Sequence, residues 1–219
     1  MRLFPKSLRP TGNPIIHQKK PFDENMFYPY KISFYQSGTA ALAASIIATI
    51  KCYPDIETPE IIIPVYCCPD IVSAIIYANA KPVTVDLEEN LPWLCIQSIE
   101  EAITDNTVCV IAVNFLGIQE RIQILKKICT DNSIALIGDN AQGFPLEEYE
   151  NYWDSDYNII SFGRGKPVNL LSGGAVVTKR NDLFEKLPKV NHLCEKRIDL
   201  FLYIIKSHIY NLGSKPYIY

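Results

Sequence analysis

The sequence predicts an α/β protein, a three-layer α/β/α arrangement with a mostly parallel sheet in the middle layer. Two observations predict this fold. Short runs rich in Ile and Val, apolar along nearly their whole length, recur along the chain, and segments with helical patterns separate them. A strand that is apolar on both sides is buried on both faces, and parallel sheets covered by helices contain such strands.

The expected elements follow in order. The first thirty residues carry five prolines and little periodicity, which indicates an extended arm over 1–30. A segment rich in Ala and Leu predicts a helix over 38–51, and proline in a first turn predicts another over 69–78. Shorter amphipathic patterns predict helices over 98–103 and 118–130. Apolar runs predict strands over 60–64, 81–86, 107–113, 134–139, 157–162 and 174–178.

The last part of the chain differs from the rest. Residues 194–212 predict a long helix that is apolar on more than one face, and such a helix needs a further covering surface. We therefore expect three parts: an arm over 1–30, a large domain over 31–190, and a C-terminal helix over 191–219.

Composition excludes several classes of function. The net charge of −3 does not favour nucleic acid or an anionic membrane as a partner. Seven cysteines with no C-x-x-C pair indicate packing thiols in a reducing compartment, without a disulfide framework or a zinc site. We find no signal peptide and no apolar run of 18 residues, so the expected location is the cytoplasm, without a membrane span.

Three segments carry residues suited to chemistry. Ser37 to Leu42 forms a small-residue turn into a helix, where free N–H groups suit a phosphate; the alternative is an ordinary N-cap. Asp139 ends a buried strand, where it could hold a cationic ring nitrogen or merely cap the next loop. Lys166 lies in a glycine-rich loop, where it is either an amine that forms Schiff bases or a surface charge.

In this order the three segments resemble the DegT/DnrJ/StrS family of sugar aminotransferases, from about Phe34 to Arg180. The family's S-G-T-x-A-L is similar to 37–42, its proline-led strand to 63–69, and its next strand to 78–86. Its H-x-x-G segment corresponds to 114–117, its E-D-x-A-Q motif to 138–142, its S-F-x-x-x-K motif to 161–166, and its glycine pair to 173–174.

The resemblance implies the large domain of the fold-type I enzymes and the cofactor pyridoxal 5′-phosphate. Gly38, Thr39 and Ser161 would bind the cofactor phosphate. Asp139 would pair with the pyridine nitrogen, and Gln142 would reach the 3-oxygen of the ring. Lys166 would be the Schiff-base lysine and the catalytic residue that moves the proton. No metal is implied.

Several positions depart from the family pattern. Cys68 stands where many members stack an aromatic residue on the cofactor ring, and nearby Tyr66 is a possible substitute. Gly138 replaces an acid, Asn114 replaces a common histidine, and the loop at 163–165 lacks the usual proline. Family members also continue into a smaller C-terminal domain, which we expect to be missing here.

The resemblance implies an aminotransferase that acts on a keto group of a nucleotide-activated sugar, with glutamate or glutamine as amino donor, and that works as a homodimer. Dehydrating members carry histidine at the position of Lys166, so the lysine favours transamination. The alternative hypothesis is a truncated, non-catalytic remnant that serves only as a binding or assembly fragment.

Overall fold

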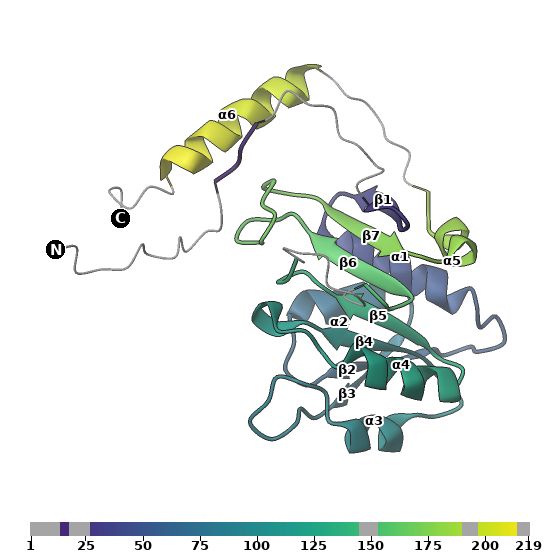
Figure 1. Ribbon diagram of the computed structural model, residues 1–219. Coiled ribbons are helices and arrows are strands. Elements are labelled where there is room, and N and C mark those ends of the chain that lie inside the picture. The colour runs from purple at the N-terminus through teal and green to yellow at the C-terminus, as the bar shows by residue number, and fades with distance from the viewer. Residues whose placement is uncertain (1–13, 18–26, 145–152, 190–196, 214–219) are drawn as a thin grey trace.

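A computed structural model of the protein describes residues 14–17, 27–144, 153–189 and 197–213 (Figure 1). Its strands are β1 (Lys31–Tyr35), β2 (Glu60–Pro64), β3 (Lys81–Val85), β4 (Thr107–Val113), β5 (Ala135–Asp139), β6 (Tyr157–Ser161) and β7 (Gly174–Thr178). Its helices are α1 (Gly38–Ile50), α2 (Pro69–Tyr77), α3 (Ile96–Ala102), the 3₁₀ turn η2 (Phe115–Gly117), α4 (Ile122–Asp131), α5 (Asn181–Lys186) and α6 (Arg197–Gly213).

The seven strands form one sheet in the order β1-β7-β6-β5-β4-β2-β3. The pairs between β3 and β6 along this order are all parallel, and β7 pairs antiparallel with both β6 and β1. The expected mostly parallel sheet is therefore confirmed. The parallel strands place their carboxyl ends at one edge, which is where ligands bind in open α/β sheets.

Helices cover both faces, which confirms the three-layer arrangement. Alternate residues of β4 show how: Cys109 and Ile111 belong to the core under α1 and α2, whereas Val110 and Ala112 pack toward α3 and α4. All seven residues of β4 are buried, as its continuous apolar sequence predicts. An aromatic cluster around Trp153 and Phe162 covers the part of the second face over β6 and β7.

Three elements differ from the expectations. Strand β1 was not predicted: it lies at the sheet edge, half-exposed, and depends on its pairing with β7. The short helix α5 was also not predicted. The helix expected over 118–130 begins only at Ile122. The buried Asn114 side chain accepts a hydrogen bond from the Glu120 amide, and the buried Glu120 carboxylate accepts from the amides of Arg121 and Leu94. These hydrogen bonds hold the stretch before Ile122 outside a helix.

Helix α6 lies apart from the sheet in Figure 1, beside the segment 14–17. Ile15 exchanges two hydrogen bonds of 2.8 Å with the side-chain amide of Asn211, and His17 Nε2 lies 2.6 Å from the hydroxyl of buried Ser207. The expected helix start at Cys194 lies outside the described residues. Part of α6 is thus covered by the N-terminal segment, while Phe201 and Ile209 remain about two-thirds exposed.

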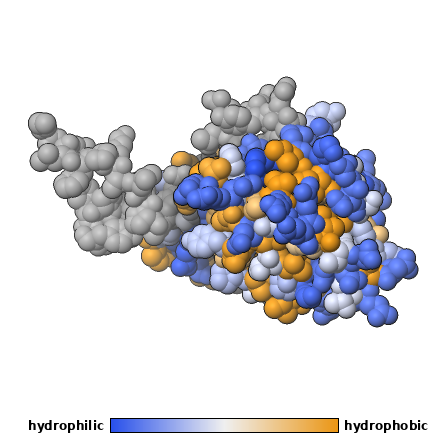
Figure 2. Space-filling model, turned by 90° about the horizontal axis from the view of Figure 1, so that it is seen from below, coloured by the Kyte–Doolittle hydropathy of each residue, from blue (hydrophilic) through white to orange (hydrophobic). Residues whose placement is uncertain are grey.

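The surface of the sheet domain is mixed. Seen from below, hydrophobic areas lie among hydrophilic side chains (Figure 2). Of the helices that the structure describes, none combines the length and the apolar character needed to cross a bilayer.

Candidate active site

The carboxyl ends of the parallel strands and the start of α1 surround a cavity of about 370 Å³. Strand ends supply Cys68 and Asp70 after β2, Asn114 after β4, Asp139 at the end of β5 and Ser161 at the end of β6. The cavity has a size typical of small-molecule sites. All seven residues expected to form the site line this one cavity, namely Gly38, Thr39, Cys68, Asp139, Gln142, Ser161 and Lys166.

One end of the cavity is formed by the first turn of α1. The Ser37 hydroxyl caps the helix by accepting a hydrogen bond of 3.0 Å from the Ala40 amide. An added Cβ at Gly38 would lie 2.8 Å from Ser161 Cβ, and one at Gly174 would lie 2.5 Å from the Gly38 nitrogen. Only glycine permits these close approaches, which bring the start of α1, the end of β6 and the start of β7 together.

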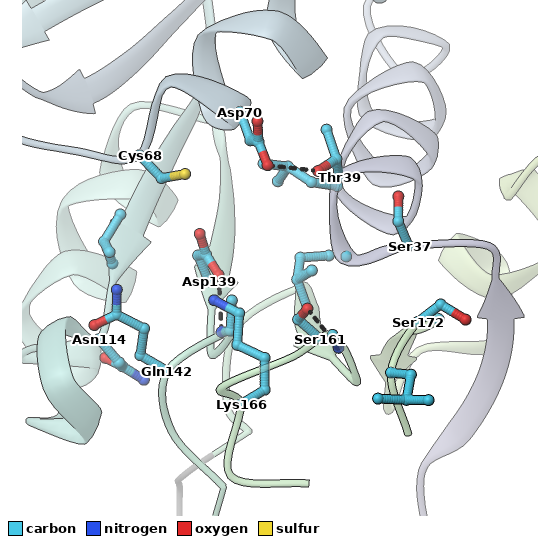
Figure 3. Close-up of a pocket in the computed structure, with 18 residues that line it drawn as sticks. Ser37, Thr39, Cys68, Asp70, Asn114, Asp139, Gln142, Ser161, Lys166 and Ser172 are labelled. Carbon is cyan, nitrogen blue, oxygen red and sulfur yellow. Dashed lines mark hydrogen bonds between the residues drawn. The ribbon is translucent and has the colours of Figure 1, made fainter. Parts of the chain in front are cut away.

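At this end the cavity offers donors to an anion. The N-terminus of a helix carries a partial positive charge, and backbone N–H groups there suit an anionic ligand. The hydroxyls of Thr39 and Ser161 lie beside it (Figure 3). Ser161 Oγ also accepts a long hydrogen bond of 3.4 Å from the Gly163 amide, which ties it to the loop that carries Lys166.

The other end of the cavity holds Asp139 and Lys166. Asp139 is buried, and this burial raises the pKa of its carboxyl; a 2.9 Å hydrogen bond from the Ala141 amide and the positive charge of Lys166 partly oppose that rise. The side chain of Lys166 extends toward Asp139 (Figure 3). A buried acid facing a cation in a cavity is a common arrangement of catalytic sites.

A buried amide network fixes the strand ends behind Asp139. The Asn114 side chain accepts from the Glu120 amide at 2.7 Å and donates to the Asn140 side chain, which in turn donates to the Gly138 carbonyl at 3.2 Å. Gln142 Oε1 accepts from the Leu116 amide at 2.8 Å, within a turn where Leu116 has a φ of 52°. Asn114 therefore has a structural partner set where many family members have histidine.

The position after β2 contains no aromatic ring that faces the cavity. Cys68 lines the cavity and is exposed, whereas Tyr66 is not among the residues that line it. The Tyr66 ring packs with Phe115 at a centroid distance of 5.7 Å. The possibility that Tyr66 substitutes for the stacking residue is therefore not supported by its placement.

Four polar residues of the cavity were not among the seven expected site residues: Ser37 and Asn114, which belong to segments described above, and Asp70 and Ser172, which the sequence had not suggested. Asp70 accepts a 3.1 Å hydrogen bond from Thr39 Oγ1, and Ser172 lies beside the glycine pair. Asp70 follows the end of β2, and Ser172 precedes the start of β7, both at the ligand-binding edge of the sheet. A polar residue at this edge was the signal that could have identified them.

Comparisons with known proteins agree with this geometry. The DegT/DnrJ/EryC1/StrS aminotransferase family model matches residues 28–200. The dTDP-4-amino-4,6-dideoxy-D-glucose transaminase of Shigella dysenteriae is 27% identical over 208 residues, which cover 93% of this chain and 53% of that protein. The chain spans about half the length of the curated relatives that it matches, of which this transaminase is one.

Solved structures show the same fold. An aminotransferase from Psychrobacter cryohalolentis superposes with a TM-score of 0.66 at 22% identity, over 74% of this chain and 41% of that one. NtdA of Bacillus subtilis, solved with bound cofactor PMP, gives a TM-score of 0.59 at 23% identity, over 71% of this chain and 34% of that one. At this identity the likeness concerns the fold alone.

Proposed function

The chain belongs to the DegT/DnrJ/EryC1/StrS aminotransferase family, and from this premise we propose that it is the cofactor-binding part of a pyridoxal-phosphate-dependent sugar aminotransferase. The substrate would be a keto group of a nucleotide-activated sugar, with glutamate or glutamine as donor. The observation that carries the proposal is the convergence of a helix N-terminus, buried Asp139 and Lys166 on one cavity. The transaminase named above has a nucleotide sugar in its name, which supports this substrate class.

The residues present fit the cofactor. The close approach of Gly38 to Ser161, which a Cβ would block, leaves a cradle for a phosphate group at the start of α1. Asp139 provides a carboxylate for a cationic ring nitrogen, and Lys166 provides the amine. With the Gln142 oxygen engaged by Leu116, its Nε2 amide is the group that can donate to a ring oxygen.

Bound pyridoxal phosphate supplies an electron sink for the α-carbon of an amino acid. The residues of the chain bind, orient and transfer the proton. Burial raises the pKa of Asp139, and a protonated ring nitrogen next to the carboxyl would lower that pKa again and favour the carboxylate. The resulting ion pair would keep the ring protonated. Lys166 Nζ accepts and returns the proton that leaves the substrate carbon.

We also propose a homodimer in the cytoplasm. The exposed apolar side chains of α6 support self-association. The six described cysteines are free thiols, as is usual for proteins of reducing compartments.

The test is chemical labelling of Lys166. The purified chain is incubated with pyridoxal phosphate, reduced with borohydride and mapped by peptide mass, with Lys166→Ala as the control. We expect the label on Lys166 and its loss in the control; a label on Lys81 or Lys179 would contradict the assignment. Adding glutamate before reduction separates the alternative, because a non-catalytic binding protein would keep the absorbance of the bound cofactor unchanged.

A further inference from the structure

Asp70 lies at the end of the cavity that suits a phosphate. It is the second residue of α2, directly after Pro69, and it lines the cavity together with Thr39 and Gly38. Its Oδ2 atom accepts the hydrogen bond of 3.1 Å from Thr39 Oγ1 (Figure 3). The hydroxyl that would donate to a phosphate oxygen is therefore directed at a carboxylate.

The charges around the cavity are unevenly placed. Of the 18 lining residues, all within the described part of the chain, Lys166 is the only one with a basic side chain, and it lies at the far end beside Asp139. The phosphate end has the positive end of the α1 dipole and the negative charge of Asp70. A phosphate monoester carries a charge of about −1.5 to −2 at neutral pH. Its nearest ionised neighbour at this end would be a carboxylate of the same sign.

We propose that Asp70 is a specificity-determining residue that lowers the affinity of this cavity for phosphate-bearing ligands. The carboxylate acts in two ways: it occupies the Thr39 hydroxyl, and it repels the phosphate. The chain consequently discriminates little between pyridoxal phosphate and unphosphorylated pyridoxal. The statement about pyridoxal phosphate and pyridoxal rests on the proposed function, whereas the lower affinity for a phosphate group does not.

The expected effect follows from Coulomb's law. Two like charges about 5 Å apart in a water-like environment change a binding constant by roughly fourfold per unit charge, so a dianion is affected by roughly tenfold after screening by salt. Removal of the Asp70 charge is therefore expected to tighten phosphate binding about tenfold at low salt and by less at high salt.

The experiment compares three variants of the full 219-residue chain. Asp70→Asn removes the charge and keeps an oxygen that Thr39 can reach, and the double variant, Thr39→Val in the Asp70→Asn background, removes the hydroxyl as well. Asp55→Asn is the matched control, because Asp55 is an exposed aspartate just beyond the opposite end of α1. Binding of inorganic phosphate is measured by calorimetry, and binding of pyridoxal phosphate and pyridoxal by absorbance, with circular dichroism to verify the fold.

We expect Asp70→Asn to bind inorganic phosphate about tenfold more tightly and to raise the preference for pyridoxal phosphate over pyridoxal by a similar factor. Asp55→Asn should change neither, and Thr39→Val should weaken phosphate binding in the Asp70→Asn background. Equal or weaker phosphate binding by folded Asp70→Asn overturns the inference, and Asp70→Ser repeats the test if the first variant does not fold. Failure of every variant to bind pyridoxal phosphate would instead refute the proposed function, while the phosphate data still decide the role of Asp70.

Discussion

Replacing Gly38 with alanine should destabilise the protein and fill the cradle at once. The added Cβ would lie 2.8 Å from Ser161 Cβ and 2.9 Å from Ser161 Oγ, and a Cβ atom essentially never approaches a non-bonded heavy atom this closely. Ser161 Cβ is attached to the backbone of a buried strand, so it cannot swing away. Overpacking of this kind costs about 1–3 kcal/mol, and the better helix propensity of alanine offsets at most about 1 kcal/mol.

The net expectation is a loss of about 1–2 kcal/mol in the free energy of unfolding. For a domain of this size, this loss corresponds to a fall in Tm of roughly 2–8 °C. The assay is thermal and urea unfolding followed by circular dichroism, with pyridoxal phosphate binding by absorbance as the second measurement. Gly213→Ala is the control, because a Cβ at Gly213 would meet nothing within 4 Å.

A double-mutant cycle identifies the contact itself. If the clash with Ser161 is the cause, the additional change Ser161→Gly removes the opposing atom and should recover at least about 1 kcal/mol relative to the sum of the single changes. Additive single effects, or a Gly38→Ala variant as stable as the parent, would refute the reasoning from this close approach.

Two further predictions concern charge and association. Burial raises the pKa of Asp139 above its value in the unfolded chain, so ionisation of Asp139 destabilises the folded cofactor-free protein at neutral pH. Asp139→Asn should therefore raise the urea midpoint of unfolding at pH 7. This gain should vanish as the pH falls below the ordinary aspartate pKa, where the carboxyl is neutral in both states. The same variant should retain pyridoxal phosphate less well, and a lower urea midpoint at pH 7 would show that the carboxylate stabilises the fold. On α6, Phe201 and Ile209 are exposed, and we expect the chain to self-associate at micromolar concentration in sedimentation experiments. Replacing both residues with serine should shift the chain toward the monomer. A parent chain that is already monomeric would contradict this prediction.

The sequence by itself determined the elements whose burial is the same on both faces. The strands expected at 60–64, 107–113 and 174–178 have these bounds in the structure, because every residue in them is buried. The polar residues that follow such strands could also be identified, since the carboxyl ends of parallel strands meet at one edge. Asp139 was a candidate for this reason, whereas Ser161 and the Schiff-base role of Lys166 at the same site were implied by the resemblance to the sugar aminotransferases.

Only the tertiary structure decided the features that depend on distant partners. Strand β1 exists through its pairing with β7, about 140 residues later in the chain, and its own half-exposed sequence carries a weak signal. The start of α4 depends on side chains of Asn114 and Glu120 that bind backbone amides. Asp70 accepts a hydrogen bond from Thr39, 31 residues earlier in the chain, because the first turns of α1 and α2 lie at the same edge of the sheet. Local patterns encode burial, whereas the pairing of particular groups depends on the order of the strands, and that order is set by the packing of the whole domain.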